Sequence, residues 1–353
     1  MRALPVALLL LAGPATADRL PPLPLTIEDV LAHGDAAPQR GDQATLRGLE
    51  QLIESTPPSD PARAEYELAL VAFHADQGRY YERLASTAAI GDSGSCDKHA
   101  QRAATWNAAA EQRLVALTQG APLTDRALLG LVLVRARKGL AQSAAALDAY
   151  RTLVTRHPRS PWLGFAHAAL GDLYAPTEEA SRATPYYERA ARSSARPAAA
   201  YARYQLGTLK LRAGDARGAA VALAKAASLA VDLKADPVGA AARAELVELL
   251  PASMAPRAIV PFLRTSLGPS RAPALAEAMA TSLASSGQPA DGAVVLKALV
   301  ASFAKAPRAC VWRATLAHAL ALAGADPTHE LSAARGQVTD RTTACKRALE
   351  ALD

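Results

Sequence analysis

Residues 167–174 read HAALGDLY and residues 203–210 read RYQLGTLK, so a Leu-Gly pair recurs in the middle of the chain. Alanines and one larger side chain follow each pair at matching distances. Four pairs of positions are separated by 36 residues: Leu170 and Leu206, Gly171 and Gly207, Ala183 and Ala219, Ala190 and Ala226. A spacing shared by four positions indicates an internal repeat, and a repeat of this length is typical of stacked helical hairpins.

Small residues explain this pattern physically. Gly171 and Ala183 are expected to face each other across two antiparallel helices, because small side chains allow two backbones to approach closely. Tyr174 and Tyr187 are expected to fill the space beside that contact. A single helix pair cannot bury its apolar face alone, so such units stack on one another. The pattern predicts an all-α fold, a solenoid of helical hairpins.

The composition agrees with helices. The chain has 353 residues, of which 50% are hydrophobic and only 5% aromatic. Alanine and leucine favour helices, and we find no sustained alternation of apolar and polar residues that would indicate a sandwich or barrel. A chain of this length usually forms more than one domain, but a solenoid can grow further, because each repeat contacts only its neighbours.

The first seventeen residues have the pattern of an export signal. Arg2 precedes an apolar run at residues 4–11, and Ala15-Thr16-Ala17 is a small-x-small cleavage site. The mature chain is therefore expected to begin at Asp18, with a Pro-rich spacer over residues 18–25. No later run is apolar for long enough to predict a membrane span. These features predict a periplasmic or secreted protein.

The central pattern resembles the tetratricopeptide repeat (TPR) of bacterial cell-envelope proteins. Pro158-Arg-Ser-Pro161 before the first Leu-Gly helix is similar to the TPR part of the Tol–Pal-associated cell-division coordinator. Residues 200–207, with the flanks of Cys96 and Cys310, resemble periplasmic TPR proteins of the gliding-motility machinery. The resemblance implies a non-catalytic adaptor, without a cofactor, that binds protein partners in the envelope.

The chain divides on this basis into an N-terminal helical region (26–120), TPR-like repeats (121–235) and degenerate helical repeats with a capping helix (236–353). Pro61 starts a helix that Gly78 is expected to end, with a shorter helix after it over residues 79–89 and a loop over residues 91–95. In the last region we expect three helix pairs and a cap: 238–250 with 254–267, 272–286 with 291–305, 311–323 with 330–338, and then 341–352.

In TPR proteins the first helix of each repeat lines a concave groove where partners bind. Aligned through the Leu-Gly pairs, this resemblance implies seven groove residues: Arg135, Lys138, Phe165, Asp172, Tyr201, Tyr204 and Arg212. Aromatic and arginine side chains are common where partners bind. The alternative is that Phe165, Tyr201 and Tyr204 pack between neighbouring repeats.

Charge and metal-ligating residues indicate no other binding function. The net charge is +6 and falls to about +5 once Arg2 is removed, but the basic residues are dispersed and form no nucleic-acid module. Cys96 and His99 are close in sequence but have no other candidate ligands nearby, so no metal site is predicted.

The three cysteines allow a disulfide in an oxidising compartment. A Cys310–Cys345 bridge would close a loop of 35 residues and stabilise the fold by roughly 3–4 kcal/mol in the chain-entropy model. Cys96 would then be unpaired. A bridge from Cys96 to either of the others, or no bridge at all, remains open.

An enzymatic alternative rests on residues 91–94. Gly91-Asp92-Ser93-Gly94 matches the nucleophile segment of chymotrypsin-like proteases, but Ser95 stands where a second glycine is needed, and that fold is all-β. A helical exported hydrolase is therefore the alternative function, and a polar loop between helices is the expectation that we favour.

Overall fold

The computed structural model describes residues 43–88, 93–119, 123–177, 180–230, 237–338 and 343–350. These residues form sixteen α-helices and two short 3₁₀ turns, and no strand occurs among them. The prediction of an all-α fold is confirmed. The predicted signal peptide, the mature start at Asp18, the Pro-rich spacer and the start of the N-terminal helical region all lie outside the described residues.

Contacts divide the chain into two compact units. Of the described residues, the first unit contains those from 43 to 202 and Pro237, and the second contains those from 203 to 230 and from 238 to 350. Helix α9 (Arg196–Arg212) begins in the first unit and ends in the second. The three regions predicted from the sequence, with boundaries at 120/121 and 235/236, follow the repeat pattern. The two compact units follow contacts instead, so those boundaries stay predictions.

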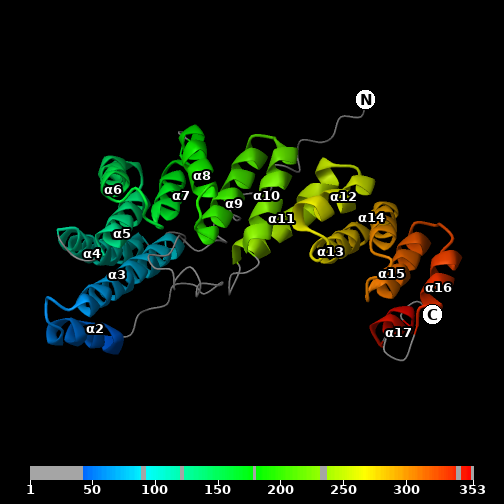
Figure 1. Cartoon of the computed structure of the whole chain (residues 1–353), viewed down its shortest axis with the longest axis horizontal. Coiled ribbons are helices and arrows are strands. Elements are labelled where there is room, and N and C mark those ends of the chain that lie inside the picture. The colour runs from blue at the N-terminus through cyan, green and yellow to red at the C-terminus, as the bar shows by residue number, and fades with distance from the viewer. Residues whose placement is uncertain are drawn as a thin grey trace. The chain divides into compact units, whose positions relative to one another are not determined.

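The first unit is built from long and short helical hairpins. Helix α3 packs along α4, α5 packs against α6, and α7 packs against α8, while α5 also contacts α4 and α7 (Figure 1). The helices are α2 (Gln43–Ser55), α3 (Pro61–Ala88), α4 (Ser93–Leu117), α5 (Thr124–Arg137), α6 (Ser143–Arg156), α7 (Leu163–Tyr174) and α8 (Ala183–Ala191).

Two predictions about local structure in this unit are wrong. Gly78 does not end a helix, because α3 runs without a break to Ala88. A Cβ at position 78 would lie 2.2 Å from Oδ1 of Asn107, so this glycine serves the close approach of α4. Residues 93–95, which were predicted to lie in a loop, are the first residues of α4.

The two Leu-Gly glycines make equivalent contacts. A Cβ on Gly171 would lie 2.4 Å from Cε1 of Tyr187, and a Cβ on Gly207 would lie 2.8 Å from Cγ of Leu223. Tyr187 and Leu223 are themselves 36 positions apart and both are fully buried. The alanines of the pattern, at 183, 190, 219 and 226, are fully buried as well. Glycine is therefore required at both positions so that the second helix of each hairpin can pack closely.

The second unit continues with helices that are all shorter than α3 and α4. After the last turns of α9 come α10 (Ala216–Ala230), α11 (Pro237–Ser253), α12 (Pro256–Leu267), α13 (Ala272–Ser285), α14 (Pro289–Ser302), α15 (Ala309–Leu322), α16 (Thr328–Arg335) and α17 (Thr343–Glu350). Helix α13 packs against α14, α14 against α15, and α15 against α16 and α17. The three predicted helix pairs and the cap agree closely with these bounds.

Three hairpin turns of this unit share one geometry. Gly214, Gly287 and Gly324 all have φ between 74° and 81°. The N–H that follows each glycine donates to a carbonyl five residues back, as in Asp215 to Lys210 at 2.9 Å and Gln288 to Leu283 at 2.8 Å. This is the Schellman arrangement, in which glycine takes the left-handed conformation that ends the helix.

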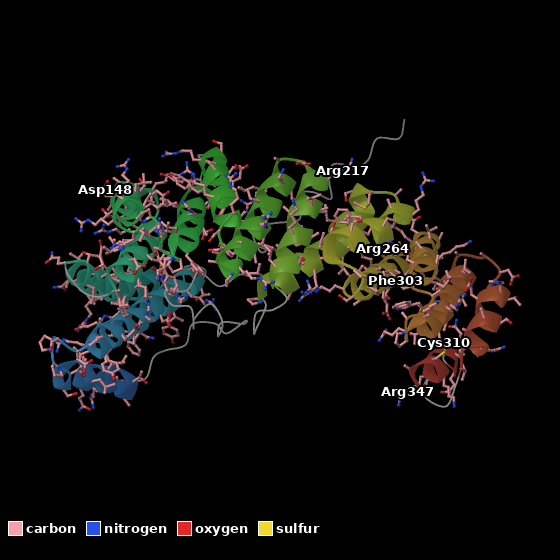
Figure 2. The ribbon with its side chains drawn as sticks, viewed as in Figure 1. Asp148, Arg217, Arg264, Phe303, Cys310 and Arg347 are labelled. Carbon is pink, nitrogen blue, oxygen red and sulfur yellow. A yellow bond between two sulfur atoms is a disulfide. The ribbon has the colours of Figure 1, made fainter. Side chains whose placement is uncertain are left out.

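Helix α17 is held to α15 by the predicted cysteine pair. The Cα atoms of Cys310 and Cys345 are 5.7 Å apart and the two sulfurs form a disulfide (Figure 2). Ala314, Ala334 and Leu349 surround the bridge in a small buried cluster. The structure thus selects Cys310–Cys345 among the pairings that the sequence left open, and Cys96 is unpaired.

Candidate functional site

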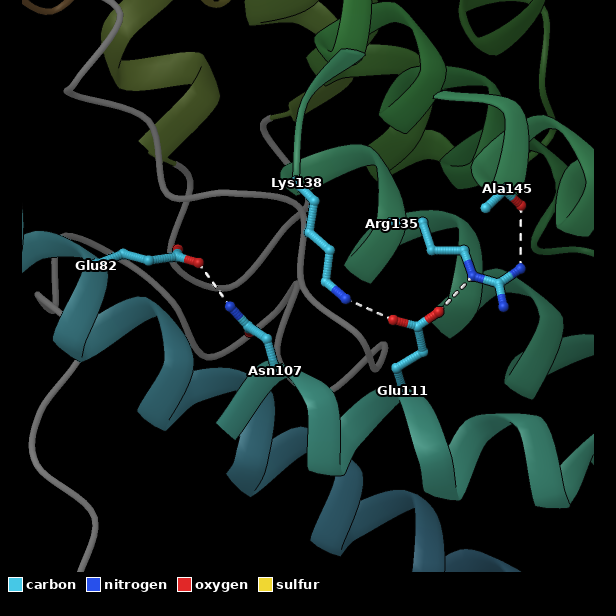
Figure 3. A network of polar contacts seen from close by, with 6 residues as sticks. All are labelled: Glu82, Asn107, Glu111, Arg135, Lys138 and Ala145. Carbon is cyan, nitrogen blue, oxygen red and sulfur yellow. Dashed lines mark hydrogen bonds and ion pairs between the residues drawn. The ribbon is translucent and has the colours of Figure 1, made fainter. Parts of the chain in front are cut away.

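Arg135 and Lys138, the first two predicted groove residues, are engaged within the first unit. Arg135 Nε and Lys138 Nζ bind the two carboxylate oxygens of Glu111 on α4, at 2.8 Å and 2.5 Å (Figure 3). Arg135 Nη1 also donates to the carbonyl of Ala145 on α6 at 3.1 Å. Desolvation raises the pKa of Glu111, but the hydrogen bonds and charges of Lys138 and Arg135 outweigh it and lower the pKa overall. The two cations therefore connect three helices.

The three predicted aromatic groove residues are core residues. Phe165 is 2% exposed, Tyr204 is 4% exposed and Tyr201 is 8% exposed. The prediction that these rings face a partner is wrong, because packing between helices removes them from solvent. The Tyr204 hydroxyl donates to Glu245 on α11, so even its polar end has an intramolecular partner.

Asp172 joins three helices through two tyrosine hydroxyls. Tyr187 on α8 donates to Oδ1 of Asp172 at 2.6 Å, and Tyr201 on α9 donates to the same oxygen at 2.9 Å. Desolvation raises the pKa of Asp172 to about 7, although both hydrogen bonds act to lower it. This carboxyl was predicted to line the groove, whereas its hydrogen bonds are made within the first unit.

Arg212 is the last of the seven predicted groove residues and is exposed at the end of α9. Lys138 is also exposed, and Arg135 and Asp172 are partly so, which leaves these four as the predicted residues that a partner can reach. Tyr204 and Arg212 belong to the second unit and the other five to the first. Their role in partner binding remains a prediction.

The residues considered for chemistry give no assembled site. Gly91 and Asp92 lie outside the described residues, and Ser93 begins α4. Across the described part of the chain, no group of three or more His, Cys, Asp or Glu side chains is placed to hold a metal ion.

A hollow surface that the sequence did not predict lies in the second unit. One pocket, of about 530 Å³, is lined by residues of α10, α11 and α13, by the last residue of α12 and by the turn before α13. Most of its lining is apolar, with two arginines and one serine: Ala227, Arg243, Ala244, Val247, Leu267, Ser270, Arg271, Ala274, Leu275 and Ala278.

A second pocket, of about 560 Å³, adjoins the first and shares Ser270 and Ala274 with it. It extends to the segment before α15, and the rest of its lining is Pro273, Glu277, Ala306, Pro307, Arg308 and Trp312. We call these two hollows the Ala274 pockets. They join the surfaces of α11, α13 and α15, which are the first helices of the predicted pairs.

The polar groups of the Ala274 pockets are held in place by hydrogen bonds. Arg271 Nη1 donates to the backbone carbonyl of Ser228 at 3.1 Å. Glu277 pairs with Arg308 through one oxygen and accepts from Nε1 of Trp312 through the other, at 2.9 Å. Trp312 is buried, so its ring forms part of the floor while its N–H orients the carboxylate.

Sequence reasoning missed this surface because alanine occurs on both faces of these helices. Ala244, Ala274 and Ala278 are exposed in the pockets, whereas Ala242, Ala276 and Ala280 are buried in the core. Periodicity cannot separate the two sets in an alanine-rich helix. The remaining indication of this surface in the sequence was a pair of arginines, Arg271 and Arg308, each of which stands just before a helix.

Comparison with models of protein families and with curated proteins finds no match for this chain. Among the described helices, none combines the length and the apolar character that crossing a membrane requires.

Proposed function

We propose that this chain is an exported, TPR-like adaptor that binds a protein partner in the cell envelope and carries out no catalysis. The observation that carries the proposal is the Ala274 pockets, an open and mostly apolar surface along the first helices of successive hairpins. Open apolar surface costs solvation free energy, and in a folded protein it commonly marks a binding site.

The remaining support comes from the fold and the cysteines. Glycine-mediated hairpin contacts at Gly171 and Gly207 are those expected of the TPR-like pattern. A disulfide that closes a C-terminal helix is typical of proteins from oxidising compartments. Together with the export pattern of residues 1–17, this supports a periplasmic or secreted location.

The test is capture of a partner from the native host. The mature protein, tagged at its C-terminus, is used to recover proteins from detergent-solubilised envelopes, and these are identified by mass spectrometry. We expect one or a few envelope proteins to be enriched over the same preparation with heat-unfolded bait. Recovery of no protein above that control would contradict the adaptor function.

The hydrolase alternative has its own assay. A serine-reactive fluorophosphonate should leave the folded protein unmodified if it is an adaptor. Specific labelling at Ser93, lost on unfolding, would instead support an enzyme.

A further inference from the structure

The shape of the Ala274 pockets comes from small side chains. Ala244 on α11 and Ala274 and Ala278 on α13 are exposed, and no long side chain of the described residues fills the space above them. Val247 and Leu275 complete the apolar wall of the first pocket. A surface of this kind stabilises apolar side chains of a ligand by removing them from water.

The charge of the pockets is positive. Among the described residues, three arginines and one glutamate line them, which gives a net charge of +2, and none of those that line the first pocket is acidic. The single glutamate, Glu277, already binds Arg308 and Trp312. Arg271 makes no ion pair among the described residues, and Nη1 of its guanidinium donates to a neutral carbonyl, that of Ser228. That bond fixes the guanidinium beside the apolar wall.

From this combination we propose that the Ala274 pockets bind a peptide segment in which aspartate or glutamate alternates with leucine-sized apolar residues. The carboxylates would bind Arg271, since guanidinium–carboxylate pairs are the stronger kind of hydrogen bond. The apolar residues would enter the two adjoining hollows. The proposal rests on the proposed function and names the chemistry of the partner.

The choice of a peptide follows from the arrangement of the two pockets. They share Ser270 and Ala274, so a chain can occupy both in succession. A small anion would use the arginines but leave the apolar walls open, and a basic segment would meet positive charge. An acidic and apolar segment satisfies both parts of the surface.

Binding is tested with three short fluorescein-labelled peptides and the full mature protein. One alternates leucine with glutamate, one alternates leucine with lysine, and one alternates serine with glutamate. By fluorescence anisotropy we expect the leucine–glutamate peptide to bind at least about tenfold more tightly than the other two. Equal binding of the serine–glutamate peptide would mean attraction by charge alone and would overturn the proposal, as would equal binding of the lysine peptide.

Variants assign the binding to this surface. Arg271→Gln removes the charge but keeps a donor for Ser228, and Ala274→Leu fills the space that both pockets share. Each should weaken the binding of the leucine–glutamate peptide at least about tenfold. Arg257→Gln and Ala258→Leu make the same changes at exposed positions of α12 outside the pockets, and each should alter binding less than about twofold. Equal losses in variants and controls would place the site elsewhere.

Two further measurements separate the outcomes. Arg271→Lys keeps the charge and should bind better than Arg271→Gln, and unchanged circular dichroism melting of both shows that the fold is intact. If wild-type protein captures envelope partners and Arg271→Gln captures them equally well, the adaptor function stands and this inference fails. If the peptides do not bind and Arg271→Gln instead abolishes self-association in sedimentation, the occupant is a second copy and the inference is likewise overturned.

Discussion

At the residue scale, Gly171 determines how closely α7 and α8 pack. A Cβ at this position would lie 2.4–2.8 Å from three atoms of the Tyr187 ring, which is itself fully buried. Gly171→Ala should therefore lower the free energy of unfolding by about 1–3 kcal/mol, because the ring has no room to move away. Urea unfolding followed by circular dichroism measures this loss.

Gly48→Ala is the matched control for that substitution. Gly48 lies within α2, and a Cβ there would meet nothing within 4 Å. Alanine is the better helix former by about 1 kcal/mol, so this variant should be as stable as the wild type or more so. A loss at Gly48 as large as that at Gly171 would show that backbone effects, and not the Tyr187 contact, explain the result.

Asp172 should make stability depend on pH. Its pKa is raised from 3.8 to about 7 by desolvation, so between these values the folded protein binds more protons than the unfolded chain. The contribution of this carboxyl to the free energy of unfolding therefore declines as the pH rises from about 4 to 7. Given its partial exposure, the decline should be roughly 1–3 kcal/mol.

Asp172→Asn keeps a carbonyl oxygen for the hydroxyls of Tyr187 and Tyr201 but cannot ionise. The stability of the variant should therefore fall less than that of the wild type over the same pH range, as measured by urea unfolding at intervals from pH 4 to pH 8. Parallel curves for the two proteins would contradict the assignment of this titration to Asp172.

At the scale of the helices, the turn glycines terminate one helix and direct the next. Gly287 has φ 81°, and a side chain there is strained whatever the space around it. Gly287→Ala should destabilise the protein by about 1–2 kcal/mol, the cost of the left-handed conformation for an L-residue. Thermal unfolding of the purified variant gives the value.

Gly336, at the end of α16, provides the comparison for Gly287. It has φ −65°, and the nearest atom to an added Cβ is 3.5 Å away. The free energy of unfolding of Gly336→Ala should therefore lie within about 0.5 kcal/mol of the wild-type value. A similar loss at both positions would argue against backbone strain as the cause.

At the scale of the whole molecule, the cysteines and the N-terminus report on export together. Protein purified from its native host should begin at Asp18 and, when unfolded without reductant and alkylated, should carry the label on Cys96 alone. Peptide mapping by mass spectrometry reads both. An intact Met1, or alkylation of all three cysteines, would contradict export through an oxidising compartment.

The sequence by itself determined the all-helical fold, the bounds of most helices and two kinds of glycine. The Leu-Gly pattern located close contacts at Gly171 and Gly207. The predicted helix bounds left residues 287–290 and 324–329 as turns, where Gly287 and Gly324 end their helices, because both features depend on local spacing. Gly78 was misread, since a glycine that ends a helix and one that admits a neighbouring helix have the same local context. Only the neighbour, here Asn107, distinguishes them.

Tertiary structure alone decided which side chains of each helix are exposed. Phe165, Tyr201 and Tyr204 were candidates for a groove, and the structure buries them because packing between successive helices covers the face on which they lie. The Ala274 pockets have the opposite origin, since their alanines are exposed because no other helix in the described part of the chain covers them. Burial depends on residues far apart in the chain, and the period of a single helix does not contain that information.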